Sequence, residues 1–225
     1  MKRIFLIGGA IFLSKACFGW DMGLDFRNSK SYVTDAAYGV AITTNDINSH
    51  TLSNSNGDSV TVQLSHIQSG FSNRNSSNDA RVAGMSYNNL IAGTSIQITL
   101  PATGNYNIGA AIGDPSFAQG GSGSTIQCRF SDSNTFLFTV STGSTLGAGH
   151  FLDAKDTEFT SAANWVSGNA TQAVTFATTT LNVLCLVTST GVNIPISHIR
   201  ITSTGGGGAS ASPQTQQVIV TGDDS

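Results

Sequence analysis

The sequence has little charge and few of the residues that solvate a helix surface. Charged residues make up 10% of the 225-residue chain, which contains a single Glu, Glu158, and four Lys. Because Glu and Lys commonly cover exposed helix faces, their shortage disfavours a helix-rich fold. Gly, Ser, Thr and Asn take their place, and this composition suits strands and turns.

An excess of positive charge is also missing, since the formal net charge is −3. A protein that neutralises nucleic-acid phosphates needs a basic surface. We therefore expect no nucleic acid among the partners of this chain.

Close groupings of catalytic residues are absent as well. The four His residues are scattered, and the sequence has no HExxH, G-x-S-x-G or Walker pattern. His66 and His198 fall in strand-like runs, where a single His is more often a packed or surface residue than a ligand or base. We expect no catalytic residue, no cofactor and a role that is not enzymatic.

Two Asx-rich segments resemble pieces of calcium loops, namely Asn54-x-Asn56-x-Asp58 and Asp153-x-x-Asp156. Calcium takes several carboxylate and amide oxygens from one turn. Neither segment completes an EF-hand, and Asx side chains in turns more often bond their own backbone. We therefore predict no metal site.

The N-terminus has the three-part layout of a secretory signal peptide. Basic residues precede an apolar run at 4–13, which is too short to span a bilayer, and small residues follow before Cys17. Residues 1–19 are thus predicted to be a signal peptide, and the protein to be secreted or at the cell surface. The alternative is an anchoring segment of a virion protein that is never secreted.

The rest of the chain predicts one all-β domain at residues 20–204, a jelly-roll-like antiparallel β-sandwich. Many short runs alternate apolar and polar residues and are separated by Gly, Asn and Ser clusters. The predicted strands are 31–34, 38–43, 59–66, 95–100, 106–112, 125–130, 135–140, 173–176, 181–187 and 198–202. A short helix is expected near 160–165.

Residues 205–225 form a flexible, Gly/Ser-rich linker and tail by composition. Residues 217–221 have strand composition and can pair with a sheet edge of the same or another subunit. The competing interpretation is a disordered tail.

Cys128 and Cys185 each lie in an apolar strand-like run. In an exported protein they can form a disulfide between neighbouring strands. Two buried free thiols are an equally good interpretation of the same pattern.

The most distinctive polar stretch supplies the predicted ligand-binding residues. Arg74, Asp79 and Arg81 lie between Phe71 and Tyr87, in a region with little other charge. Planar polar groups suit sugar hydroxyls, and an aromatic ring suits the apolar face of a pyranose. The alternative is a structural loop in which Asp79 pairs with one of the Arg side chains.

Trp165 is a second aromatic candidate for stacking on a sugar. It is more often expected as a core residue, because a large aromatic in a chain of small residues fills space between sheets.

Several motifs recur in the order seen in one group of sandwiches. They are GLDFR at 23–27, the stretch 74–84, LPATGNYNI at 100–108 followed by Gly-Asp, and ISHIRI at 196–201. Together they resemble the malectin-like branch of the galactose-binding-like β-sandwiches. The resemblance implies a sandwich with an opening strand, a central hairpin and a closing strand, and a glycan as ligand.

The same motifs are similar to proteins of tailed phages and environmental bacteria, which implies a virion-exposed role as an alternative. The first hypothesis is therefore a non-catalytic surface module that binds glycan. The second is a phage decoration or fibre component that self-associates through its sandwich and its C-terminal strand.

Overall fold

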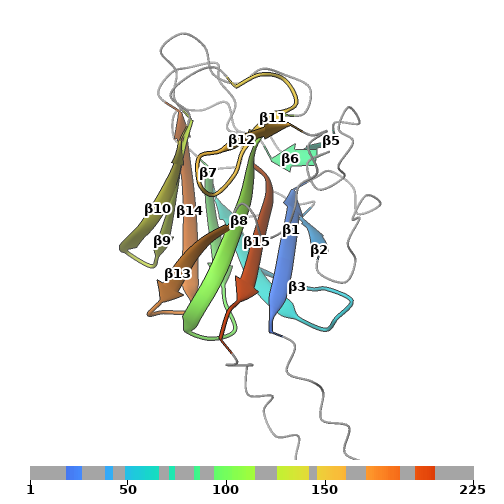
Figure 1. The fold of residues 1–225 in the computed structure, drawn as a ribbon. Helices are drawn as coiled ribbons and strands as arrows, with labels where there is room; N and C mark the ends of the chain where they lie inside the picture. The colour runs from blue at the N-terminus through green and yellow to red at the C-terminus, as the bar shows by residue number, and fades with distance from the viewer. Residues whose placement is uncertain are drawn as a thin grey trace, which may run out of the picture.

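The computed structural model describes residues 19–26, 39–42, 49–65, 71–73, 84–86, 94–114, 126–141, 146–160, 171–187 and 196–205. In these residues the regular elements are β-strands, which form a two-layer sandwich (Figure 1). The all-β sandwich predicted from the alternating runs is confirmed.

One layer is a nine-stranded sheet, in which the order β12-β11-β8-β15-β1-β2 forms the main path and β13, β5 and β6 branch from it. Its strands are β1 (Asp21–Phe26), β2 (Gly39–Ile42), β5 (Phe71–Asn73), β6 (Gly84–Ser86), β8 (Gly104–Asp114), β11 (His150–Leu152), β12 (Glu158–Thr160), β13 (Thr171–Phe176) and β15 (Ile196–Ser203).

The other layer is a six-stranded sheet with the order β10-β9-β14-β7-β4-β3. Its strands are β3 (Ser49–Ser53), β4 (Ser59–Ser65), β7 (Thr94–Thr99), β9 (Ile126–Asp132), β10 (Thr135–Ser141) and β14 (Thr180–Val187). All its pairs are antiparallel. In the nine-stranded sheet, β1 pairs with β2 in parallel.

The turn at 101–103 does not close a hairpin, which corrects the expectation drawn from the LPATGNYNI motif. The strand before it, β7, belongs to the six-stranded sheet, whereas β8 belongs to the nine-stranded sheet. The turn therefore carries the chain from one layer to the other. Tyr106 fixes it, since its hydroxyl donates to the carbonyl of Ala102 at 2.8 Å.

Three other sequence predictions fall on residues that the structure does not describe. These are the strand at 31–34, the residues after Thr160 in the expected helix, and the strand at 217–221. Thr160 itself ends β12.

The core fills the space between the sheets. In β4 and β9 every second side chain is buried, as a strand with one solvated face requires. Phe130 of β9 and Phe138 of β10 stack there with ring centroids 4.4 Å apart. Fully burying one such side chain contributes about 1.5–3 kcal/mol to folding.

Trp20, which comes just before β1, already belongs to this core. Trp20 is buried and packs edge-on against Tyr106, which packs in the same way against Phe176. The backbone of Ser203 donates to the carbonyl of Trp20 at 2.8 Å. The start of β1 and the end of β15 are thus joined at one end of the sandwich, at the bottom of Figure 1.

Asp132 joins the end of β9 to the turn between β13 and β14. Its carboxylate accepts hydrogen bonds from the hydroxyl of Thr178 and from the amides of Ala177 and Thr178. Burial alone raises the pKa of this carboxyl, but the three donors outweigh burial and lower the pKa below its ordinary value. The carboxylate therefore stays charged and ties the two strand ends together.

Candidate functional site

The two sheets differ in what covers their outward sides. In β1, β8 and β15 most residues are buried on both sides of the strand. In β4 and β9 the outward side chains are mostly exposed or half-buried. The outward side of the six-stranded sheet is therefore the larger surface that the described residues leave open to a ligand.

We call this surface the outer face, and its residues lie in rows across the strands. The first row is Thr51, Thr61, Thr99 and Thr180, the second is Ser49, Gln63, Gln97, Asn182, Ser131 and Phe136, the third is Ser65, Ser95, Leu184, Arg129 and Thr139, and the fourth is Leu186, Gln127 and Ser141. Each row joins residues that lie directly opposite one another in neighbouring strands.

The polar rows are ordered by their own hydrogen bonds. The hydroxyls of Thr51 and Thr61 are 3.1 Å apart, and the amide of Gln97 donates to the side-chain oxygen of Asn182 at 3.2 Å. Because these partners hold the side chains in place, less conformational entropy is lost when a ligand binds. The second row runs from β3 to β10, a width of about 24 Å at the usual strand spacing.

Apolar side chains lie beside the amides. Leu184 and Leu186 are each 38% exposed, and Phe136 is 51% exposed. Leu184 stands opposite Arg129 in the neighbouring strand, and Leu186 stands opposite Gln127. The outer face thus combines hydrogen-bonding amides with apolar surface, as sites for small polar ligands with an apolar side do.

A β-bulge in β10 brings Phe136 onto the outer face. The register between β9 and β10 shifts between Phe136 and Phe138, so that Leu137 is the extra residue. Without the bulge, Phe136 and Phe138 would share the buried side of the strand, because side chains alternate. Bulges often re-aim a side chain beside a functional site. Phe136 lies under the guanidinium of Arg129, 5.2 Å from Cζ to the ring centroid.

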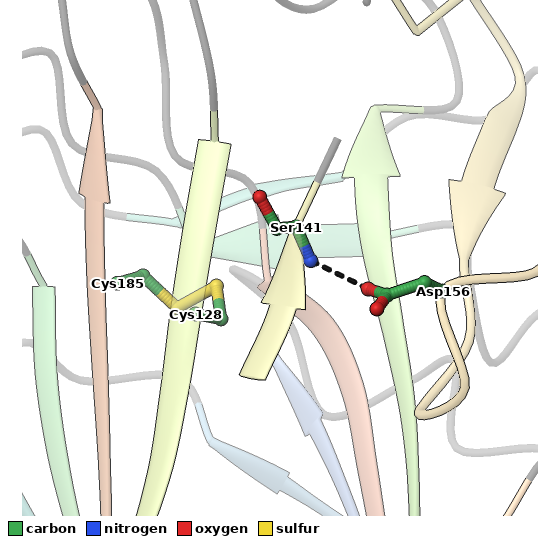
Figure 2. The surroundings of a disulfide bond; sticks show 4 residues. All are labelled: Cys128, Ser141, Asp156 and Cys185. Carbon is green, nitrogen blue, oxygen red and sulfur yellow. Dashed lines mark hydrogen bonds between the residues drawn. A yellow bond between two sulfur atoms is a disulfide. The ribbon is translucent and has the colours of Figure 1, made fainter. Parts of the chain in front are cut away.

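The disulfide between Cys128 and Cys185 lies on the buried side of the same strands (Figure 2). The sequence left a disulfide and free thiols as alternatives, and in the structure the sulfurs are bonded. The two residues are directly opposite each other in β9 and β14. The bond therefore ties together the strands that carry Arg129 and Leu184.

The edge of this sheet is also fixed. Ser141 of β10 donates its amide hydrogen to the carboxylate of Asp156 at 2.6 Å (Figure 2). Asp156 lies in the turn between β11 and β12 of the other sheet. A side chain from one layer thus holds the edge strand of the other.

Two acid–base pairs lie on the outward side of the nine-stranded sheet. His198 Nδ1 is 2.7 Å from Asp25 Oδ1, and both side chains are almost fully buried. Arg200 donates to both carboxylate oxygens of Asp21 at 3.0 and 2.6 Å. Because the His198 pair is shielded from solvent, we assign it to the structure and not to chemistry on a substrate.

The Asx-rich segments act as backbone turns. Asn54 accepts the amide of Asp58 at 2.9 Å, and Asp153 accepts the amides of Lys155 and Thr157 at 2.7 and 3.0 Å. Among the described residues, no three His, Cys, Asp or Glu side chains gather where they could hold a metal ion.

No helix in the described ranges has the length and apolarity needed to cross a membrane.

The residues predicted to bind a ligand lie mostly outside the described ranges. These are Arg74, Asp79, Arg81, Tyr87 and Trp165.

Phe71 is the first residue of β5, which pairs with β6, and β6 pairs with β15. The segment 74–83 therefore connects two strands of the nine-stranded sheet. The outer face belongs to the other layer.

Sequence reasoning missed the outer face, although one signal was present. In the run 181–187, Leu181, Val183 and Cys185 are buried, so Leu184 and Leu186 are apolar residues out of phase with the core. Out-of-phase apolar residues in a half-buried strand indicate an exposed apolar patch. The position of Phe136 had no such signal, because it depends on the bulge.

Comparisons with known proteins give distant matches to solved structures. No protein-family model matches the sequence, and no curated protein matches it significantly. Protein YXIM from Bacillus subtilis matches over 83% of this chain with 14% identity and a TM-score of 0.39. The matched region spans 40% of that chain.

Two further matches are to carbohydrate-binding modules. One is TmCBM61 in complex with β-1,4-galactotriose, with 12% identity, 76% of this chain and 98% of that chain covered, and a TM-score of 0.29. The other is the C-terminal CBM6 of LamC, a marine laminarinase from Zobellia galactanivorans, with 13% identity, 81% and 99% coverage, and a TM-score of 0.23. The malectin-like and phage-protein resemblances stay predictions.

Proposed function

We propose that this protein is a non-catalytic module that binds a glycan on its outer face. The observation that carries the proposal is the row of Gln63, Gln97 and Asn182 beside exposed Leu184 and Phe136. A pyranose has hydroxyls around its edge and C–H groups on its faces. Amides bind the hydroxyls, and exposed apolar side chains pack against the C–H groups.

The width of the outer face favours an oligosaccharide over a single sugar. Six neighbouring strands contribute to the second row, which contains the amides, and the first row, which contains the Thr hydroxyls, runs beside it. A chain of sugars lying across the strands meets one side chain from each strand in turn. Several weak contacts then add up, as extended binding surfaces require.

Export of the protein is part of this proposal. A buried disulfide is typical of proteins that fold in an oxidising compartment. The predicted signal peptide at residues 1–19 points to the same compartment. A glycan of a cell surface or of the surrounding medium is then the accessible ligand.

The test is a glycan array followed by calorimetry with two face variants and one control. Gln97→Ala and Leu184→Ala should each weaken binding about 5- to 30-fold, the range for one lost hydrogen bond or apolar contact. Thr157→Ala removes an exposed hydroxyl from the turn between β11 and β12, outside the outer face, and should change affinity less than twofold. A folded wild-type protein that binds no glycan on the array would overturn the proposal.

A further inference from the structure

The described basic residues differ in what they contact. Arg200 is held by both oxygens of Asp21. Lys155 is exposed in the turn between β11 and β12. Arg129 is exposed on the outer face, where its charged group lies over the ring of Phe136. Among the described residues, the rows that define the outer face contain no Asp or Glu.

Arg129 is therefore a positive charge on a surface that is otherwise neutral, in a protein of net charge −3. Removal of residues 1–19 would take away Lys2, Arg3 and Lys15 and make the formal charge −6. A single cation against a negative background attracts an anionic group to one defined place.

The side chains around Arg129 leave its guanidinium N–H groups available and strengthen the hydrogen bonds that these groups form. The ring of Phe136 covers one side of the guanidinium, and Leu184 and Thr139 stand opposite Arg129 in the two neighbouring strands. The N–H groups at the rim of a planar guanidinium can donate to a carboxylate while an aromatic ring lies beside the group. The apolar side chains of Phe136 and Leu184 exclude part of the water from the exposed guanidinium, which modestly strengthens a charged hydrogen bond formed there.

We propose that the outer face recognises an acidic glycan, in which the carboxylate of a uronic acid is bound by Arg129. This inference rests on the proposed glycan-binding function and names the class of glycan. The planar guanidinium fork matches the two oxygens of a carboxylate. Neighbouring sugars of the chain then lie along the amides of Gln97 and Asn182.

The experiment measures binding of the full protein to polygalacturonate, alginate and hyaluronan, each beside its carboxyl-reduced form. Dextran sulfate beside dextran tests a sulfate as the source of the negative charge. We expect at least one polyuronate to bind about tenfold more tightly than its reduced form, with affinity that falls as salt is raised.

Three variants test whether the preference for the polyuronate over its reduced form depends on Arg129. Arg129→Gln should reduce affinity for the polyuronate about 10- to 100-fold, the range for a lost charge-assisted hydrogen bond. It should leave affinity for the carboxyl-reduced polymer nearly unchanged. Arg129→Lys should recover only part of the loss, because a lysine has no fork. Lys155→Gln removes the same charge from another surface and should have little effect.

The outcomes separate this inference from the proposed function. Equal binding of acidic and reduced polymers, or an unaltered preference in Arg129→Gln, would overturn the inference while glycan binding stands. A preference for dextran sulfate over every polyuronate would replace the carboxylate with a sulfate and overturn the uronic-acid assignment. A wild-type protein that binds no polymer in either set, and no glycan on the array, would remove both proposals.

Discussion

Phe136 and Phe138 are two positions apart in β10 and have opposite surroundings. Phe136 is 51% exposed and lies under Arg129, whereas Phe138 is 7% exposed and stacks on Phe130 in the core. The bulge at Leu137 separates them. An exposed aromatic ring contributes little to folding, and Phe136 supports Arg129 on the proposed binding face.

Replacing these two rings should therefore give opposite results. Phe138→Ala should lower the free energy of unfolding by about 3 kcal/mol or more, because it leaves a cavity in the core. Phe136→Ala should cost about 1 kcal/mol or less, yet weaken glycan binding, because Arg129 loses the ring that supports it. Urea unfolding and calorimetry measure the two effects. Equal losses of stability in both variants would contradict the assignment of Phe136 to the site.

At the scale of elements, β9 and β14 form the centre of the outer face. They are joined by the disulfide between Cys128 and Cys185, and Asp132 at the end of β9 accepts hydrogen bonds from the turn that leads into β14. Their outward residues Arg129 and Leu184 stand directly opposite each other. Two long-range links thus fix the strands that present the proposed contacts.

Removing the disulfide should destabilise the fold without changing its register. The two Cys are 57 residues apart, for which the chain-entropy model gives about 4 kcal/mol. Cys128→Ala/Cys185→Ala should therefore lower the free energy of unfolding by about 2–4 kcal/mol in thermal or urea unfolding. The wild type in reducing agent is the matched comparison. A double variant as stable as the oxidised wild type would show that the bond constrains nothing.

At the scale of the whole molecule, the two layers differ in how much of their outward side is exposed to solvent. The nine-stranded sheet buries most of β1, β8 and β15 on both sides and shields the pair of His198 and Asp25 from solvent. The six-stranded sheet keeps one open side. The folded layers include Trp20, so the sandwich begins directly after the predicted signal peptide.

The position of Trp20 restricts where a signal peptidase can cut. Cleavage before Cys17, or between Cys17 and Trp20, keeps the contact of Trp20 with Tyr106. We expect the intact mass of protein exported from its native N-terminus to match one of these cuts, on a monomer by light scattering. An uncleaved chain that elutes as a defined oligomer would contradict this and favour the virion hypothesis.

The predicted binding residues between Phe71 and Tyr87 can be tested with the same binding assay. The composition of the stretch predicts Arg74, Asp79 and Arg81 as binding residues, and they lie outside the described ranges. If glycan binding depends on Arg81→Ala and not on Leu184→Ala, the loop and not the outer face carries the contact.

The pattern of amino acids was enough to predict the all-β class and most of the strands, because side-chain alternation and turn residues act over a few positions. In the run 59–66, for example, Val60, Val62 and Leu64 already define the buried side of β4.

The layer that each strand joins could not be predicted in this way, since it depends on contacts between residues far apart in the chain. The LPATGNYNI segment reads as a hairpin but passes between the layers. The outward turn of Phe136, its contact with Arg129 and the pairing of Cys128 with Cys185 all depend on strand register. Side-chain alternation decides which side of a strand is buried, but which residues of distant strands stand opposite each other depends on packing across the whole sheet.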